Sequence, residues 1–495
     1  MTLSLMKLSR QQPLSDRSRW LAFFGVSLSL FLSITNGTSL NVALPALQQE
    51  MDAPFEHVQW VLLAFIFGTT VFMPLVGALG DAVDKRKLFT AGVAVFGIGA
   101  LAGGLSPTLP MLVASRFVQG MGTAVISALA FAILAEVFDA AERGRAIGWS
   151  SGISTLAIIC GPALGGAMLH FASWRWLFFL VVPAALALAI FVWRVLPASA
   201  AQKSPRLDVD GLLTSSGGLL ACLLGLTWIP SRGLDAAVAA LLLAGTALLL
   251  RFWRRLDRSP RPLVDPEVLR RPAVFAALGG EMAVFAATHS FFFLLPFLLE
   301  NGLRLTPLQM GLVLMTNPFI QAAISPASGR LADRLGATPL TISGLLCLGG
   351  GFLAMTALDT QSGPLDVALC LVPVGLGVGL FVPANAAGMV QATPASSMAS
   401  TTSALALSRR VAQAFGLALL TLLWTRQLGS QAETAPPAAL LGAFDAILWL
   451  FPTLLIGGLA LQILARRSSR GRSSISAIHR SLDPNTDPRP SGRRS

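Results

Sequence analysis

Two related stretches decide the fold. The first reads Gly77-Ala78-Leu79-Gly80-Asp81-Ala82-Val83-Asp84-Lys85-Arg86-Lys87. The second reads Gly329-Arg330-Leu331-Ala332-Asp333-Arg334-Leu335-Gly336. Each follows a long apolar segment, and the two aspartates, Asp81 and Asp333, stand 252 residues apart. Because one short motif recurs at the same place in each half of the chain, we expect a duplicated fold with two parallel halves.

The composition around these stretches is that of a membrane protein. Of 495 residues, 54% are hydrophobic and 12% are charged, and the mean hydropathy is +0.69. Soluble domains carry about 25% charged residues. Apolar segments recur from one end of the chain to the other, so most of it must contact an apolar solvent. The four cysteines form no CxxC pair, so we expect no metal site, no cofactor and no disulfide framework.

Apolar segments of about 20 residues can cross a bilayer as helices. Fourteen such spans are predicted, at residues 20–45, 58–79, 88–106, 110–135, 146–170, 174–196, 208–230, 235–253, 273–299, 306–328, 338–357, 366–390, 401–425 and 443–465. With the N-terminus inside, 29 of the 36 Lys and Arg residues fall on the inside, 4 fall outside and 3 lie within spans. Cytoplasmic loops collect such residues. The net charge of +12 therefore needs no nucleic-acid partner, and both termini are expected in the cytoplasm.

Further motifs lie in these spans. They are Asn41-Val42-Ala43-Leu44-Pro45, Arg116-Phe117-Val118-Gln119-Gly120-Met121-Gly122, Gly161-Pro162-Ala163-Leu164-Gly165-Gly166 and Trp174-Arg175-Trp176-Leu177-Phe178. Together with the duplicated loop, they resemble the signatures of the major facilitator superfamily over about the whole chain. The glycine-proline motif and the fourteen spans resemble the superfamily's fourteen-helix drug:proton antiporter branch.

The resemblance implies an all-α integral membrane protein of the major facilitator fold, with two six-helix bundles plus two inserted central helices (fourteen transmembrane helices). It divides the chain into a cytoplasmic N-terminal segment, a first bundle, the inserted seventh and eighth helices, a second bundle and a disordered basic cytoplasmic tail. Their residues are 1–19, 20–200, 201–260, 261–465 and 466–495.

The duplicated loops and their surroundings are candidate gates. A carboxylate on a short cytoplasmic loop can face the N-terminus of a neighbouring helix, where free N–H groups favour negative charge. The resemblance implies such a contact in each half, formed only when the inner side is closed. The alternative is that these are ordinary solvated loop charges. The candidate gating residues are Asp81, Arg86, Asp333, Arg334 and Arg143.

The glycine-proline motif offers a narrow helix surface. Gly161, Gly165 and Gly166 allow close helix contact, and Pro162 removes one backbone donor and permits a bend. We interpret the motif as a seam between the halves that prevents leak during transport. Generic helix packing is the alternative and rests on the same physics.

Three titratable residues inside the spans are candidates for proton coupling. Charges in a span are costly and usually face the interior, which places Arg116 in a pathway or pairs it with backbone carbonyls. Glu281 lies roughly 15 Å from its helix start, near the midplane, where a carboxyl can gain and lose a proton. A permanently protonated or arginine-paired Glu281 is the alternative. His289 shares the face of Glu281 only loosely.

Uncharged polar residues in the spans are candidates for the substrate cavity. They are Asn36, Gln119, Asn317 and Asn385, the last two beside prolines that we expect to break helices. The drug-exporter branch usually has Asp at the position of Asn36, and an amide does not titrate, so the proton is expected elsewhere. Arg409 and Arg410 are predicted near the cytoplasmic end of the thirteenth span, as interface or gate charges.

These features predict a secondary active transporter of the plasma (inner) membrane. It would export amphipathic small molecules, as multidrug efflux proteins do, by proton antiport with alternating access. Its partners would be the substrate, protons and the lipid bilayer, and a periplasmic adaptor is left open. The alternative is one narrow substrate, such as a siderophore, lipid, sugar or metabolite. No GxxxxGK[ST] or HExxH motif occurs, so we expect neither an ATP-driven pump nor an enzyme.

Overall fold

A computed structural model of the chain describes residues 15–198, 209–256, 267, 271–393, 398–428 and 436–464, apart from some side chains within helices. These ranges are helical and contain no strand. The first half comprises α1 (Asp16–Glu50), α2 (Phe55–Ala82), α3 (Lys85–Gly104), α4 (Leu109–Val137), α5 (Ala140–Phe171), α6 (Trp176–Phe179) and α7 (Val181–Val195). Two helices follow, α8 (Val209–Arg232) and α9 (Ala236–Leu256).

The second half begins with α11 (Pro272–Phe297), which continues into the π-helix η1 (Leu298–Gly302). It continues with α12 (Pro307–Leu314), α13 (Thr316–Leu335), α14 (Ala337–Ala354), the 3₁₀ turn η2 (Met355–Ala357), α15 (Pro364–Gln391), α16 (Met398–Leu428) and α17 (Pro437–Leu448). Residues 450–464 beyond α17 are also helical.

The helices agree with the fourteen predicted spans. Within the described ranges, eleven are long and apolar enough to cross a membrane. Three more helical units stand where the seventh, tenth and thirteenth spans are predicted. The first is α8, whose apolar part Leu213–Ile229 is short. The second is α12 with α13, which are divided at Met315. The third is α16, which carries two partly buried arginines, Arg409 and Arg410.

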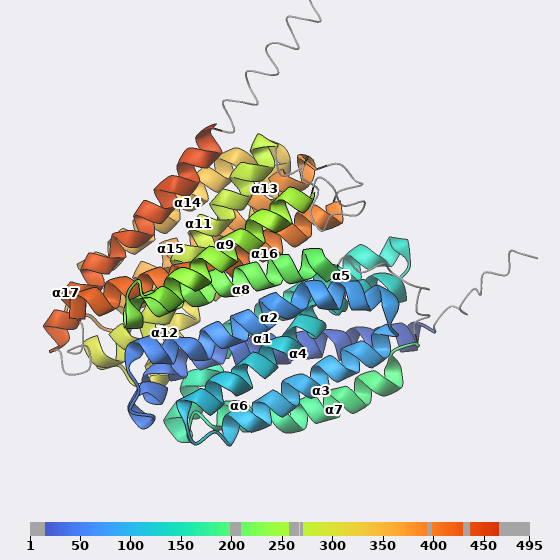
Figure 1. The fold of residues 1–495 in the computed structure, drawn as a ribbon, viewed down its shortest axis with the longest axis horizontal. Coiled ribbons are helices and arrows are strands. Elements are labelled where there is room, and N and C mark those ends of the chain that lie inside the picture. Colours follow the sequence, from blue (N-terminus) through green and yellow to red (C-terminus); the bar gives the residue numbers. More distant parts are fainter. Residues whose placement is uncertain are drawn as a thin grey trace, which may run out of the picture.

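The two halves repeat one pattern of helix pairs. In the first half α2 and α3 pack on α4, and α1 packs on α5. In the second half α13 and α14 pack on α15, and α11 packs on α16. Figure 1 shows the halves as two layers, with α8 and α9 lying between them in this view. The expected duplicated fold is confirmed, and α8 contacts α2 and α16, one helix from each half.

Glycines allow the closest helix contacts. A Cβ atom built on Gly68 of α2 would lie 2.3 Å from the carbonyl oxygen of Phe117 in α4. A Cβ atom on Gly120 of α4 would lie 2.4 Å from the carbonyl oxygen of Phe65 in α2. Neither methyl group fits, so these two backbones touch directly, as small residues permit in membrane helices.

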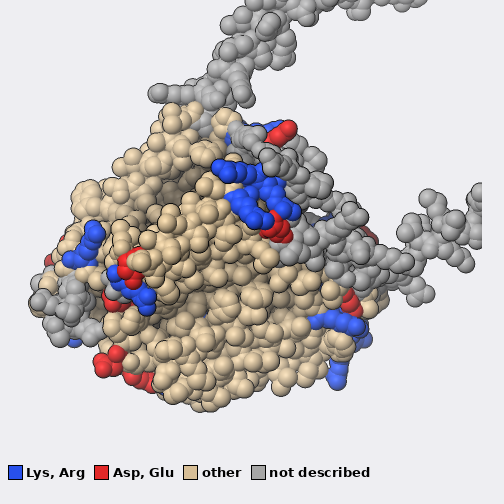
Figure 2. All heavy atoms as spheres, viewed as in Figure 1, with Lys and Arg blue, Asp and Glu red and all other residues tan. Residues whose placement is uncertain are grey.

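The outer surface of the helices is apolar between two polar ends. Ile98, Leu186 and Leu243 are each more than 60% exposed. Soluble proteins rarely expose large apolar patches, so this surface is typical of a protein in a membrane. In Figure 2 the charged side chains gather toward the ends of the molecule and leave a broad uncharged belt. We call the end where α1 begins and α2 ends the first face, and the end where α1 ends and α2 begins the second face.

Candidate transport pathway

A buried carboxylate joins three helices of the second half. Glu281 of α11 is fully buried and accepts hydrogen bonds from Arg409 Nε of α16 and from Asn385 Nδ2 of α15, the latter at 2.8 Å. Asn385 Nδ2 also donates to the carbonyl oxygen of Ala277 at 2.9 Å. Gln462 Nε2 donates to Asn385 Oδ1 at 3.3 Å. We call Glu281, Arg409, Asn385 and Gln462 the second-half cluster.

Arg409 is the member of the Glu281–Arg409 pair that has exposed surface. One third of its side chain is exposed, whereas its partner Glu281 has no exposed surface. The guanidinium carbon lies 4.9 Å from the ring centre of Phe285, close enough for a cation–π contact. Water can therefore reach Arg409 while Glu281 stays covered by it.

The predicted depth of Arg409 is wrong. We expected Arg409 near the cytoplasmic end of its span, but it lies roughly 16 Å from the start of α16, and its partner Glu281 lies roughly 14 Å from the start of α11. The two side chains thus meet at one depth. The described helix begins at Met398, before the apolar residues that set the predicted boundary.

Arg410 and His289 are partly exposed on the sides of α16 and α11 that face the first half, and we call the space between these sides and the first half the gap. Arg410, Leu417 and Thr421 are spaced seven and eleven residues apart from the first, which places them on one side of α16. Thr421 Oγ1 donates to Gln59 Oε1 of α2 at 2.6 Å, so this side points to the first half.

His289 lies on the side of α11 that faces the first half, as the contacts of its neighbour show. Phe293, one turn farther along, has its ring centre 5.1 Å from that of Phe55 in α2. His289 also lies within electrostatic reach of Arg410. Both side chains are partly buried. The structure therefore brings His289 to Arg410 rather than into the second-half cluster.

The first half has its own buried cluster, built around an arginine and two amides. Arg116 of α4 is fully buried, and its Nη1 donates to Asn36 Oδ1 at 3.1 Å and to Gln119 Oε1 at 2.6 Å. Gln119 Nε2 donates to the same Asn36 oxygen at 3.3 Å. Asn36 Nδ2 donates to the carbonyl oxygen of Leu177 at 2.9 Å. We call Arg116, Asn36 and Gln119 the first-half cluster.

Aromatic and backbone groups complete the surroundings of Arg116. Its Nε donates to the carbonyl oxygen of Val61 at 3.3 Å, and its guanidinium carbon lies 4.3 Å from the ring centre of Phe65. Among the described side chains no carboxylate lies within ion-pair distance of Arg116, and its Nη2 has no hydrogen-bond partner. The first-half cluster is thus a buried positive charge solvated by neutral dipoles.

The glycine-proline motif lies in two seams. Within the first half, Cβ atoms on Gly161 and Gly165 would lie 1.8 Å from Thr38 Oγ1 and 2.4 Å from the carbonyl oxygen of Ser39, both in α1. Between the halves, a Cβ atom on Gly166 would lie 2.5 Å from the carbonyl oxygen of Pro307.

The partner of Gly166 is a glycine of the second half. A Cβ atom on Gly311 of α12 would lie 2.5 Å from the carbonyl oxygen of Pro162 and 3.1 Å from Gly166 Cα. The α5 and α12 backbones therefore touch, and no side chain separates them. Helix α5 runs unbroken through Pro162.

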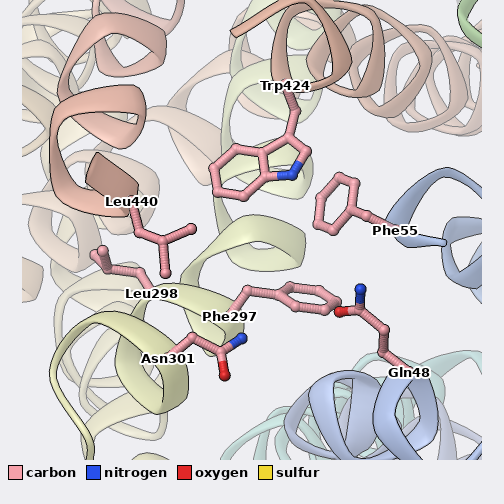
Figure 3. A pocket seen from close by; sticks show the side chains of 7 residues that line it. All are labelled: Gln48, Phe55, Phe297, Leu298, Asn301, Trp424 and Leu440. Carbon is pink, nitrogen blue, oxygen red and sulfur yellow. The ribbon is translucent and has the colours of Figure 1, made fainter. Parts of the chain in front are cut away.

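The halves are closed against each other at the second face. Phe55 of α2 stacks on Trp424 of α16 at 5.1 Å and lies edge-on to Phe297 of α11 at 4.8 Å. Figure 3 shows Phe55 and Trp424 side by side, with Phe297 below them and Gln48 and Asn301 on either side of Phe297. We call this group of rings the aromatic gate.

Three hydrogen bonds cross between the halves beside the aromatic gate. Besides the Thr421–Gln59 bond, Thr425 Oγ1 donates to Glu56 Oε2 at 3.4 Å. Gln49 Nε2 of α1 donates at 3.3 Å to Glu300 Oε1 on the π-helix η1. π-Helices are rare and often mark functional positions, and Glu300 lies within η1 at this contact.

The second face also holds a cluster that the sequence did not predict. Glu50 at the end of α1 accepts a hydrogen bond from Trp174 Nε1 at 2.6 Å and pairs with Arg175, whose guanidinium lies over the Trp174 ring. The motif Trp174-Arg175-Trp176 is thus an anchor that fixes the end of α1. The missed signal is the acid at the end of the first span.

The loop residues at the first face are described only in part. The side chains of Asp81 and Asp333 lie outside the described residues. Arg86 lies over the Trp193 ring at 4.6 Å, and Arg143 and Arg334 are exposed. Asp84, which departs from the usual glycine, caps α3 by accepting from the Arg86 backbone N–H at 3.0 Å.

The two expected helix breaks differ. The helix divides between α12 and α13 at Met315, because Pro318 has no N–H for the carbonyl of Leu314. Asn317 lies beside this division, with a buried Oδ1 that has no partner among the described groups. The break expected at Pro383 is wrong: α15 runs unbroken past it, and its tight packing on α13 and α14 holds the helix together.

Residues 26–417 of the chain match the Major Facilitator Superfamily. The chain belongs to this superfamily. It is a multi-pass membrane protein of the transporter fold, as its helix pairs and apolar belt also indicate.

Several curated members are similar over most of their length. The riboflavin transporter RibZ of Clostridioides difficile is 26% identical over 455 residues, which are 92% of this chain and 99% of RibZ. The multidrug resistance protein Stp of Mycobacterium tuberculosis is 28% identical and covers 76% of this chain and 72% of Stp. The lincomycin resistance protein LmrB of Listeria monocytogenes is 26% identical and covers 74% of this chain and 78% of LmrB.

Solved structures share the fold at lower identity. A bacterial homologue of the human lysosomal transporter Spinster superposes with a TM-score of 0.67 at 13% identity, over 92% of this chain and 98% of that chain. A peptide transporter of the POT family in complex with sulfate superposes with a TM-score of 0.67 at 18% identity, over 91% and 95%.

Proposed function

We propose that this protein exports amphipathic small molecules by proton antiport with alternating access, and that Glu281 carries the proton. The observation that carries the proposal is the second-half cluster. In it a fully buried carboxylate is held by an arginine that water can reach. Buried ionisable residues in membrane helices mark proton and ion pathways.

The exchange follows from the pairing. A proton that reaches Glu281 past Arg409 removes the negative charge and weakens the hydrogen bond that Arg409 donates. Arg409 is then free to turn toward the gap, where it meets whatever ligand is present. Because α11 contacts α1, and α16 contacts α2, across the halves, a change between α11 and α16 acts directly on the inter-half contacts.

The first-half cluster offers no comparable proton acceptor. Its hydrogen-bonding partners are amide and backbone groups, which do not titrate, and an arginine stays protonated in proteins. We therefore assign proton exchange to Glu281 and give Arg116 a structural role in holding α1, α2 and α4 together.

The arrangement of the faces supports an inward-facing state. In our proposal the first face is cytoplasmic, since the Lys and Arg residues concentrate there and such residues favour the inside. The plasma membrane then holds the protein with both termini inside. The aromatic gate and its flanking hydrogen bonds close the outer, second face.

A narrow substrate is the second candidate function. It is favoured by the similarity to the riboflavin transporter RibZ, which extends over 99% of that protein. Stp and LmrB favour drug efflux over smaller shares of their chains. A substrate panel that includes riboflavin separates the two candidates.

Glu281→Gln tests the proposal. Cells that lack other pumps would express wild type or variant, and the efflux of a panel of amphipathic dyes, drugs and riboflavin would be followed with and without an uncoupler. We expect wild-type efflux to stop with the uncoupler. We expect Glu281→Gln to abolish net efflux but to retain exchange of labelled for unlabelled substrate, because the amide keeps the hydrogen bond from Asn385.

The control is Asp359→Asn. This exposed aspartate caps the loop before α15 through Oδ1, which an amide oxygen replaces, so efflux should be unchanged. Uncoupler-sensitive efflux at the wild-type rate in Glu281→Gln would remove Glu281 from the mechanism.

A further inference from the structure

The interior of the helices carries more positive than negative charge. Arg116, Arg409 and Arg410 lie within the spans, and Glu281 pairs with only one of them. Asp445 of α17 is the other acid of the described spans that lies well inside, and it forms no ion pair with any of the three arginines. Among the described residues, Arg116 and Arg410 are thus left without a carboxylate partner.

Of these two, Arg410 is the one that a ligand can reach. Arg116 has no exposed surface and is enclosed by Phe65, Asn36 and Gln119. Arg410 is partly exposed, and it lies on the side of α16 that faces the first half. Thr421, which contacts that half, lies eleven residues farther along, or roughly 16 Å. Arg410 therefore faces the gap below the closed second face.

Most of the hydrogen-bonding capacity of Arg410 is unused among the residues that the structure describes. A guanidinium has five N–H donors, and Arg410 donates one hydrogen bond to the described groups, from Nη1 to Gln413 Oε1 at 3.3 Å. Adjacent Arg409 adds a second positive charge, partly offset by Glu281. His289 faces the same gap and adds a ring N–H donor.

We propose that Arg410, with His289 and Gln413, forms a subsite for the carboxylate or other anionic group of an amphipathic organic anion. The inference rests on the proposed transport function and names its substrate class. A guanidinium binds a carboxylate through two parallel hydrogen bonds, which the free edge of Arg410 can supply. The partly exposed ring of Phe285, one turn before His289 on the same helix, offers an apolar surface for the rest of the molecule.

The two clusters support this class rather than an organic cation. A cation in the gap would meet Arg409 and Arg410 without a free carboxylate, because Glu281 is covered by its own partners. The first half supplies Asn36 where a drug exporter of this branch usually has Asp. When protonation releases Arg409, that residue adds a second positive group to the subsite.

Binding to purified full-length protein tests the subsite without transport. The probes are three aromatic scaffolds, naphthalene, biphenyl and anthracene, each bearing a carboxylate, a carboxamide or an aminomethyl group. Quenching of tryptophan fluorescence gives an affinity for each. We expect the carboxylate to bind most tightly in every set. We expect Arg410→Gln to weaken carboxylate binding by about tenfold or more, since hydrogen bonds to charged groups are worth that factor, and to leave carboxamide binding unchanged.

Two further variants make the test specific. Arg410→Lys keeps the charge and should keep the preference for the carboxylate, which separates charge from misfolding. Arg426→Gln removes an exposed arginine of the same helix and should change nothing. Equal or tighter binding of the amines, absence of binding by every carboxylate, or an unaltered preference in Arg410→Gln overturns the subsite. Such results leave the proton role of Glu281 untouched, since that is tested by efflux with the uncoupler.

Discussion

The two buried clusters hold an arginine inside the helices in different ways. In the second half, Arg409 is paired with Glu281, and one third of the arginine side chain is exposed. In the first half, Arg116 is fully buried and is held by Asn36, Gln119 and a backbone carbonyl. A carboxylate can release its partner by taking up a proton, whereas an amide cannot. We infer from this difference that protonation can change the contacts of the second-half cluster, whereas the first-half cluster keeps its contacts.

The largest expected effect that separates the clusters is on stability. Arg116→Gln leaves Gln119 Oε1 without its buried donor and removes one donor from Asn36 Oδ1 and one from the Val61 carbonyl. A buried acceptor left without a donor costs about 1–3 kcal/mol. We expect a lower melting temperature in detergent, while any efflux that remains stays sensitive to an uncoupler. Arg426→Gln is the control at an exposed position. Uncoupled efflux by Arg116→Gln would place part of the proton pathway in the first half.

A smaller effect is expected when the first-half cluster receives the missing acid. In Asn36→Asp one carboxylate oxygen would accept from Arg116, and the other would face the Leu177 carbonyl oxygen, to which Asn36 now donates at 2.9 Å. The ionised form gains the ion pair, and the protonated form keeps the bond to Leu177. These opposing terms should leave the stability within about 1 kcal/mol of wild type.

The stability of Asn36→Asp should also acquire a dependence on pH that wild type lacks at this site. Melting temperatures measured from acidic to neutral pH check it, with Asn36→Ala as the control that removes all three hydrogen bonds of the Asn36 side chain. Identical pH profiles for wild type and Asn36→Asp would contradict the geometry of the first-half cluster.

The sequence predicted the parts of this fold that depend on hydropathy and on short motifs. The spans follow from counting apolar residues along the chain, and the duplicated loop follows from its repeated motif. The partner of Glu281 did not follow, because Arg409 is 128 residues away and packing sets the rotation and depth of its helix. One open alternative for Glu281, pairing with an arginine, is what the structure shows.

The motifs did not predict which residues they contact. Gly166 was expected in a seam, but its partner Gly311 carries no motif that the sequence alone could single out. The aromatic gate has no sequence signal either, since Phe55 and Trp424 are ordinary apolar residues at helix ends until the halves meet. Contacts between the halves depend on three-dimensional placement, which local patterns do not encode.

The central claim, that Glu281 is the group that exchanges the proton, is tested most directly by infrared difference spectroscopy of the purified protein. Spectra taken between neutral and acidic pH report the carbonyl band of buried carboxyl groups as they become protonated. We predict a band that is present in wild type and in Arg116→Gln and missing in Glu281→Gln. A band of full intensity in Glu281→Gln would contradict the account.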